Sequence, residues 1–354
     1  MALALPLHFF HALFMLVFLL SRMQFSLSSS GFIGVNYGRV ADDLPSPAQV
    51  VQLLKAQGIT KTKIFDTDAT VLSAFSGSNI TITVGLQNQQ LSDAAGSQSF
   101  TDTWVQSNIL PYYPNTLIDA IAVGNEIIFA GLQDSTQLLV PAMKNVYASL
   151  VKYNVASSIK VSSPIALGAL ETSYPPSAGS FKPDLVEPVI KPLLSFLKQA
   201  GSYLMVNAYP FFAYTANSDT ISLDYALFKD NTGATDPNNG LVYKSLLEAQ
   251  LDSVFAAMNA VGFNDVKMVV TETGWPSKGD ENQNGPSEQN AASYNGNLVR
   301  RVLTGGGTPL RLDEPLNVYI FALFNENQKT GPTTERNFGL FYPNEEKVYD
   351  IPLH

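Results

Sequence analysis

The sequence predicts an α/β protein that folds as a single (β/α)8 TIM barrel with a small insertion after the sixth strand. Eight β-rich apolar runs are spaced along the 354 residues, helical patterns lie between them, and no linker or internal repeat divides the chain. Several runs are hydrophobic almost throughout, as parallel strands are when helices cover both faces of the sheet. The predicted strands are residues 32–37, 63–66, 80–86, 118–123, 159–164, 203–209, 266–271 and 318–324.

The helical patterns follow these runs in order. The first begins at Ser46, which can form a capping box with Gln49, and it ends at Gly58. The others cover residues 69–75, 136–153, 187–200, 241–261 and 287–303, and the chain ends just after an eighth helical region. A doubly wound open sheet is the alternative, but it would usually carry a glycine-rich phosphate turn, which residues 36–43 lack. Residues 210–240 are predicted to form the insertion over one rim of the barrel.

The N-terminus predicts export. Residues 9–20 are apolar except for His11, and a serine-rich stretch follows. A run of this length is short for a membrane span and suits a signal peptide, so residues 1–30 are predicted to be one, with an N-terminal anchor as the alternative. Asn79 opens an Asn-Ile-Thr sequon and is predicted to be glycosylated. Residues 31–354 then form one catalytic domain, with no membrane association after removal of the signal.

Composition excludes several kinds of chemistry. The chain has no cysteine, which removes disulfides and thiolate sites, and its net charge of −9 argues against binding nucleic acid. The only histidines, His8, His11 and His354, lie at no strand end, which argues against a Ser-His-Asp triad and against histidine-bound zinc. We therefore expect no metal and no organic cofactor.

Carboxylates, carboxamides and aromatic residues end the predicted strands, where a barrel places its active site. Glu126 follows the fourth strand and Glu272 ends the seventh, so both should face one cleft. Two such glutamates can cleave a glycosidic bond, one as a proton donor and the other as a nucleophile or base. The alternative for each is a rim glutamate paired with lysine or arginine. Carboxamides and aromatic rings suit a sugar, and the candidates are Tyr37, Asn125, Asn207 and Tyr209.

Four motifs carry a family resemblance: residues 34–38 (GVNYG), 122–126 (AVGNE), 270–276 (VTETGWP) and 324–329 (FNENQK). In this order they closely resemble the plant endo-β-1,3-glucanases of glycoside hydrolase family seventeen, over about residues 31–351. The resemblance implies a (β/α)8 barrel and hydrolysis with retention of anomeric configuration. It also implies that Glu126 is the acid/base and Glu272 the nucleophile, with their carboxyl groups about 5–5.5 Å apart.

The same resemblance points to further site residues. Glu326, Lys329 and Glu335 match family positions near the eighth strand. A nearby cation such as Lys329 would keep the nucleophile ionised, while Glu326 would orient Lys329 or bind substrate. Glu335, next to Arg336, is expected to be ion-paired, with proton donation as the less favoured alternative. Aromatic residues in this region either contact sugar or only pack the loops. The further aromatic candidates for substrate binding are Phe212, Trp275 and Phe324.

The predicted activity is endo-hydrolysis of (1→3)-β-D-glucosidic linkages in β-1,3-glucans of the callose or laminarin type. A glucan transglycosylase and a mixed-linkage β-1,3-1,4-glucanase would use the same glutamates, and a non-enzymatic glucan-binding wall protein is a further alternative. The expected partner is a β-1,3-glucan polysaccharide or oligosaccharide, bound by a monomer. The expected location is the extracellular space or the cell wall, with the vacuole as another destination.

Overall fold

The computed structural model describes residues 30–128 and 133–353. The predicted signal peptide lies outside these residues apart from its last position. Within the two described segments, no helix combines the length and apolar character that crossing a bilayer requires.

The strands form a nearly closed parallel barrel, which confirms the predicted fold class. Nine strands are joined in the order β5-β4-β3-β2-β1-β13-β12-β9-β6, and every pairing is parallel. Only Ser163 separates β5 from β6, so these two short strands occupy one of eight positions around the ring. The barrel strands are β1 Ile33–Asn36, β2 Lys61–Lys63, β3 Thr81–Leu86, β4 Leu117–Val123, β5 Lys160–Ser162, β6 Pro164–Ala166, β9 Tyr203–Asn207, β12 Lys267–Thr273 and β13 Val318–Ile320.

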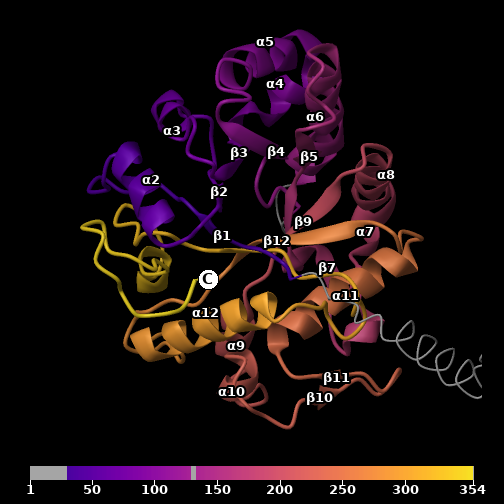
Figure 1. The fold of residues 1–354 in the computed structure, drawn as a ribbon. Coiled ribbons are helices and arrows are strands. Elements are labelled where there is room, and N and C mark those ends of the chain that lie inside the picture. The colour runs from indigo at the N-terminus through magenta and orange to yellow at the C-terminus, as the bar shows by residue number, and fades with distance from the viewer. Residues whose placement is uncertain (1–29, 129–132, 354) are drawn as a thin grey trace, which may run out of the picture.

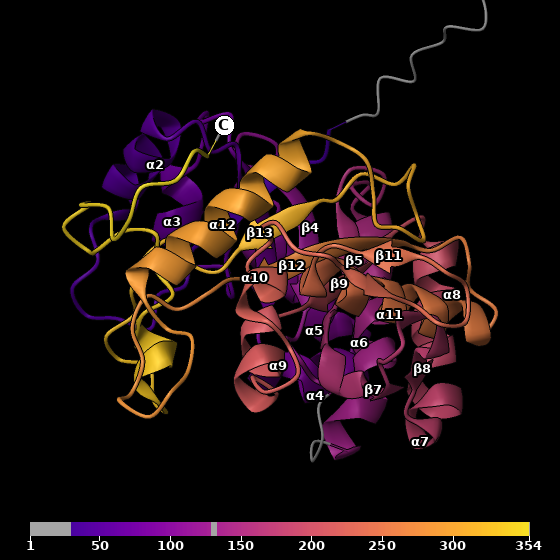
Figure 2. The ribbon, with the colours of Figure 1, turned by 90° about the horizontal axis from the view of Figure 1, so that it is seen from below.

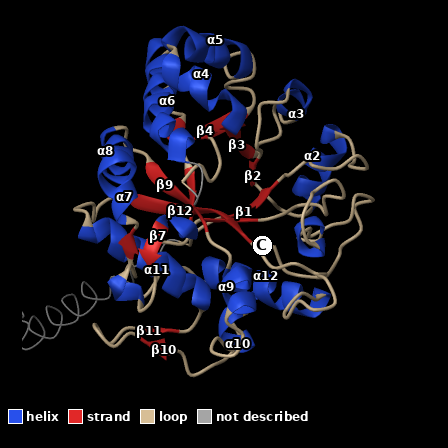
Figure 3. Ribbon diagram, turned by 180° about the vertical axis from the view of Figure 1, so that it is seen from behind, coloured by secondary structure: helices blue, strands red, loops and turns tan. Residues whose placement is uncertain are grey.

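Helices surround the strands (Figure 3). The α4–α6 group lies on one side of the barrel, and α11 and α12 lie on the opposite side (Figure 1). The predicted capping box at Ser46 is present: its hydroxyl accepts from the Gln49 amide, and the Gln49 side chain accepts from the Ser46 amide. The helices are α2 Pro47–Ala56, α3 Ala69–Ala74, α4 Leu91–Gly96, α5 Gln98–Asn108, α6 Gln133–Lys152, α7 Pro183–Leu185, α8 Lys191–Gln199, α9 Pro210–Ala216, α10 Leu223–Ala226, α11 Leu246–Ala260 and α12 Glu288–Leu303.

Several local predictions differ from the structure, and the eighth strand, β13, ends at Ile320 instead of continuing to residue 324. The second strand ends at Lys63 instead of continuing to residue 66, because β2 pairs with β3 only from Lys61 to Lys63. Helices α4 and α5 were not predicted, since their polar sequences carry little apolar periodicity. No α-helix follows β13 within residues 321–353; a 3₁₀ turn at Thr333–Arg336 and a bridge from Phe324 to Phe341 occupy this region instead. Asparagine, proline and glycine in this segment disfavour a helix.

The predicted insertion is present after β9. It contains α9, α10 and one strand of a small hairpin, β10 Ala234–Thr235 with β11 Val242–Tyr243 (Figure 2). The Asp236 carboxylate accepts from the amide and hydroxyl of Ser177, at 2.8 Å each. This contact ties the insertion to the loop region that carries β7 Leu170–Thr172 and β8 Ser180–Phe181, so both segments are fixed beside the barrel.

Candidate active site

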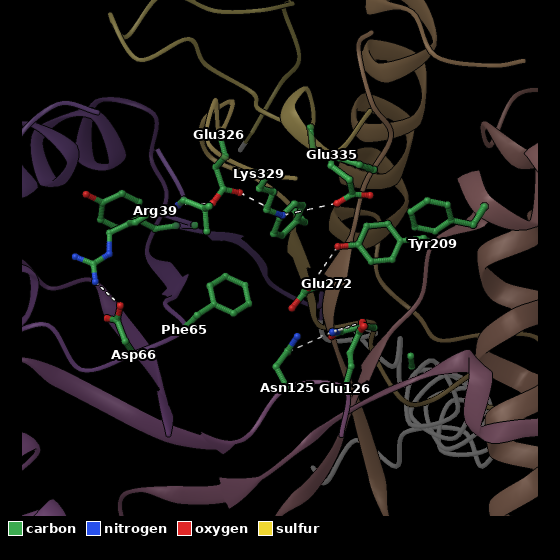
Figure 4. Close-up of a pocket in the computed structure, with 18 of the residues that line it drawn as sticks. Arg39, Phe65, Asp66, Asn125, Glu126, Tyr209, Glu272, Glu326, Lys329 and Glu335 are labelled. Carbon is green, nitrogen blue, oxygen red and sulfur yellow. Dashed lines mark hydrogen bonds and ion pairs between the residues drawn. The ribbon is translucent and has the colours of Figure 1, made fainter. Parts of the chain in front are cut away.

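A cavity of about 1260 Å³ opens at the carboxyl ends of the barrel strands. Polar and aromatic side chains from many strand ends and loops meet there (Figure 4). Ten of the twelve predicted site residues line it: Tyr37, Asn125, Glu126, Asn207, Tyr209, Phe212, Glu272, Glu326, Lys329 and Glu335.

A constrained turn after β4 presents Glu126. Gly124 has φ +66, and a Cβ there would lie 2.7 Å from a side-chain carbon of Ile127, so the turn requires glycine. Asn88 bonds to both sides of Asn125, accepting from its amide at 2.7 Å and donating to its carbonyl at 3.1 Å. Glu126 itself has φ +54, a left-handed conformation that costs about 1–2 kcal/mol for a residue with a side chain. The surrounding contacts therefore hold the glutamate in a fixed, unfavourable backbone geometry, as functional sites often do.

The end of β9 joins the two glutamates. Asn207 Nδ2 donates to Glu126 Oε1 at 2.9 Å, and two residues later the Tyr209 hydroxyl donates to Glu272 Oε2 at 2.9 Å. Thr271 fixes the Asn207 carboxamide by donating its hydroxyl to Oδ1 at 2.8 Å. Because one short segment contacts both carboxyl groups, the two lie on facing sides of the same small space.

Lys63 supplies the cation at Glu272. Its Nζ lies 2.9 Å from Glu272 Oε1, and the two side chains are 1% and 7% exposed. The same ammonium lies 3.8 Å from the centre of the Phe65 ring, a cation–π contact. Burial lowers the pKa of Lys63, and the Glu272 charge opposes that effect. The two carboxyl oxygens of Glu272 therefore have different partners, Lys63 at Oε1 and Tyr209 at Oε2.

The cation next to Glu272 was predicted to be Lys329, and the structure shows that it is Lys63. In the sequence Lys63 is only a lysine in a predicted apolar strand, and the side chain of such a lysine can equally face solvent. Its partner lies 209 residues away in the chain, a pairing that no local pattern encodes.

Lys329 instead lies between two other carboxylates. Its Nζ is 3.5 Å from Glu326 and 4.0 Å from Glu335. Glu326 is 2% exposed, accepts from the Val40 amide at 2.9 Å, and packs so closely on Gly38 that a Cβ there would lie 2.5 Å from its oxygen. Glu326 thus orients Lys329, which was one of its two predicted roles.

The expected ion pair of Glu335 is present, but the adjacent Arg336 is not its partner. The Arg336 guanidinium donates to the backbone carbonyls of Lys329 and Gly331, at 3.1 and 3.0 Å. The ion-pair partner of Glu335 is Lys329, so the arginine shapes the loop and the lysine sets the charge in the cavity.

Two predicted aromatic contacts are also corrected. Trp275 is fully buried, donates to the Gly285 carbonyl at 2.9 Å, and packs on Phe211 with ring centres 5.3 Å apart. Phe324 is 1% exposed and packs edge-on against Tyr37, at 6.2 Å. Neither lines the cavity, because each ring packs against another aromatic side chain in the interior. Both rings therefore lie in the interior, outside the cavity lining.

The environment of Glu126 favours its protonated form. Burial and the nearby Glu272 charge raise the pKa of Glu126 above its ordinary value, and the hydrogen bond from Asn207 partly opposes this. Burial also raises the pKa of Tyr209 well above its ordinary value, so its hydroxyl keeps the proton that it donates to Glu272. The two glutamates thus have different surroundings: burial and a neighbouring charge favour the protonated form of Glu126, while Glu272 is paired with a lysine.

Lys63→Met tests the buried ion pair. Removing the ammonium leaves a buried carboxylate without its counterion, so the free energy of unfolding should fall by about 3–5 kcal/mol. Chemical denaturation measures the loss. Lys61→Met, which removes a half-buried lysine that pairs with Asp119, is the matched control and should lose much less stability.

Comparison with known proteins identifies the family of this chain. The model of "Glycosyl hydrolases family 17" matches residues 33–353. Glucan endo-1,3-beta-glucosidase 14 of Arabidopsis thaliana is 43% identical, over 98% of this chain and 88% of its own. Glucan endo-1,3-beta-D-glucosidase of Olea europaea is 40% identical, over 97% of this chain and 74% of its own.

Solved structures give the same result. CJP38, described as a beta-1,3-glucanase and allergen of Cryptomeria japonica pollen, superposes with a TM-score of 0.87 at 42% identity, covering 91% of this chain and 99% of that one. A plant beta-glucan endohydrolase, from a pair described as having distinct substrate specificities, gives 0.83 at 38% identity, with 90% and 99% covered. A nearly full-length family match, close relatives and a cavity built around two strand-end glutamates lead to one conclusion: this chain belongs to family 17 of the glycosyl hydrolases.

Proposed function

We propose that this chain is a secreted endo-hydrolase of β-1,3-glucans that acts with retention of configuration. The observation that carries the proposal is the placement of Glu126 and Glu272, which line one cavity and are bonded to Asn207 and Tyr209 of a single strand end. Relatives named as β-1,3-glucanases support the choice of glucan.

In the proposed reaction Glu272 attacks the anomeric carbon while Glu126 gives its proton to the departing glycosidic oxygen. The product of this step is a covalent glycosyl-enzyme, and the ionised Glu126 then takes a proton from water, which attacks the same carbon and frees Glu272. Lys63 and Tyr209 each donate a hydrogen bond to one carboxyl oxygen of Glu272 and so orient the group for attack. Because the reaction uses two inversions at one carbon, the first product formed is the β-anomer.

Export and glycosylation belong to the same proposal. Residues 1–30 serve as the signal peptide, and the chain acts as a monomer in the wall, the extracellular space or the vacuole. Asn79 is exposed and lies two residues before the start of β3, a position that oligosaccharyltransferase can reach. Expression in a secreting host should give a protein that lacks the leader and loses mass on treatment with an N-glycosidase.

A substrate panel tests the activity. Purified protein is incubated with laminarin, mixed-linkage β-1,3-1,4-glucan and cellulose, and the lengths of the products are followed with time. We expect fastest cleavage of laminarin, with short oligosaccharides from internal cuts. Proton NMR of the first product should detect the β-anomer, as retention requires. Faster cleavage of the mixed-linkage glucan, or first formation of the α-anomer, would contradict the proposal, and products longer than the substrate would indicate transglycosylation.

A further inference from the structure

The cavity contains a carboxamide that the proposed chemistry does not use. Gln250 lies in the second turn of α11, lines the cavity and is only 8% exposed. Its Oε1 is buried and has no hydrogen-bond partner among the described residues. By contrast, Asn207 in the same cavity is bonded to Glu126 and Thr271. A buried polar group without a partner costs free energy unless something else satisfies it, so a ligand is the natural partner for Gln250.

The surroundings of Gln250 are suited to a sugar. Helix α11 packs against the loop elements around Pro176–Ala178 and against α9. Ser173 from this loop and Phe212 from α9 line the cavity together with Gln250, and the Phe212 ring is 47% exposed. An open ring face and a free amide are the two groups that bind a pyranose, one by stacking and the other through hydroxyl hydrogen bonds.

This part of the cavity lies on the leaving-group side of Glu126. The Glu126 amide donates to the carbonyl of Pro164, the first residue of β6, at 3.0 Å. Residues 166–168, at the end of β6 and just after it, line the cavity with Gln250, whereas Asp66 and Arg39 line it beyond Glu272 on the β1–β2 side (Figure 4). A proton donor contacts the oxygen of the departing sugar, so that sugar occupies the half of the cavity next to Glu126 and β6.

We propose that Gln250 is a substrate-binding residue that hydrogen-bonds a hydroxyl of a glucosyl unit on the leaving-group side of the cleaved bond, with Phe212 stacking on the same part of the chain. The same contact binds the incoming sugar when an oligosaccharide intercepts the glycosyl-enzyme. This inference rests on the proposed function, because it assumes the donor role of Glu126.

The test compares Gln250→Met with Gln52→Met, an identical change at an exposed position of α2 outside the cavity lining. Two substrates are used: laminarihexaose, which fills both sides of the site, and β-laminaribiosyl fluoride, whose leaving group is not a sugar. For Gln250→Met we expect kcat/KM on laminarihexaose to fall about three- to tenfold, the loss of one neutral hydrogen bond, while hydrolysis of the fluoride is unchanged. The positions at which laminarihexaose is cut should also shift, and Gln52→Met should match the wild type on both substrates.

The outcomes separate the two proposals. Equal losses on both substrates would mean that Gln250 only supports the fold, and an unchanged kcat/KM on laminarihexaose would mean that its amide binds no sugar; either result overturns the inference while the proposed function stands. A wild-type chain that cleaves no β-1,3-glucan overturns the proposed function and this inference with it.

Discussion

Glu272→Gln should lower kcat on laminarin by about 10⁵-fold, because a carboxamide of the same shape cannot attack the anomeric carbon. Binding of laminarin should remain measurable by calorimetry, since the Tyr209 hydroxyl still has an oxygen to bond and the cavity keeps its form. Incubation of the wild type with a slow 2-deoxy-2-fluoro glucoside should add one glycosyl group, located on Glu272 by peptide mass analysis. Residual activity above about one per cent of wild type would contradict the nucleophile assignment.

The same substitution has a stability consequence that identifies the ion pair. Glu272→Gln leaves the Lys63 ammonium buried without its counterion, so the free energy of unfolding should fall by about 3–5 kcal/mol. The double variant Glu272→Gln/Lys63→Met removes both charges and should recover most of that loss, while activity stays absent. Additive losses in the double variant would mean that the two groups do not interact.

Glu126→Gln should lower kcat/KM on laminarin by about 10²–10⁴-fold, the usual contribution of a positioned proton donor. Burial and the Glu272 charge raise the pKa of Glu126, and the donor must be protonated, so wild-type activity should fall as pH rises through that pKa. The variant has no proton to lose at this position and should lack the alkaline limb. A pH–rate profile of kcat/KM for both proteins measures the difference.

Chemical rescue and a neighbouring glutamate provide the controls for Glu126. β-Laminaribiosyl fluoride needs little help from an acid, so its first step should be far less affected, and added azide should give a β-glycosyl azide. Glu335→Gln removes the other glutamate considered as a donor, which pairs with Lys329 in the same cavity. It should keep the alkaline limb, and its loss in Glu335→Gln but not in Glu126→Gln would reverse the assignment.

Strand-end residues were predictable because barrel geometry translates sequence order into position. Apolar runs identified the strands, and the residue that follows each parallel strand faces the catalytic rim, which brought Glu126, Asn207 and Glu272 together in the prediction. Helices α4 and α5 were missed because tertiary packing, more than their polar sequences, stabilises them.

Long-range partners and side-chain directions were not predictable. Lys63 becomes the counterion of Glu272 only when the ring of strands forms, and Gln250 reaches the cavity from the middle of a helix pattern that suggested packing alone. Trp275 and Phe324 belong to the right motifs, but both lie beyond the ends of β12 and β13, where loop packing sets the direction of a side chain. A single sequence fixes the order of the strands more closely than the direction of each side chain.

Because β1 pairs with β13, the barrel of this enzyme cannot be completed until the last strand has been synthesised. Ile33 lies beside Val318, so the first strand to leave the ribosome must wait for the last one before its open edge is covered. A nascent chain that lacks β13 has an incomplete barrel, because β13 joins β1 and β2 to β12. In such a chain the strands do not bring Lys63 of β2 to Glu272 of β12. The catalytic centre can therefore be completed only after β13 has been synthesised, and a chain that terminates before β13 lacks the strand that joins β1 to β12.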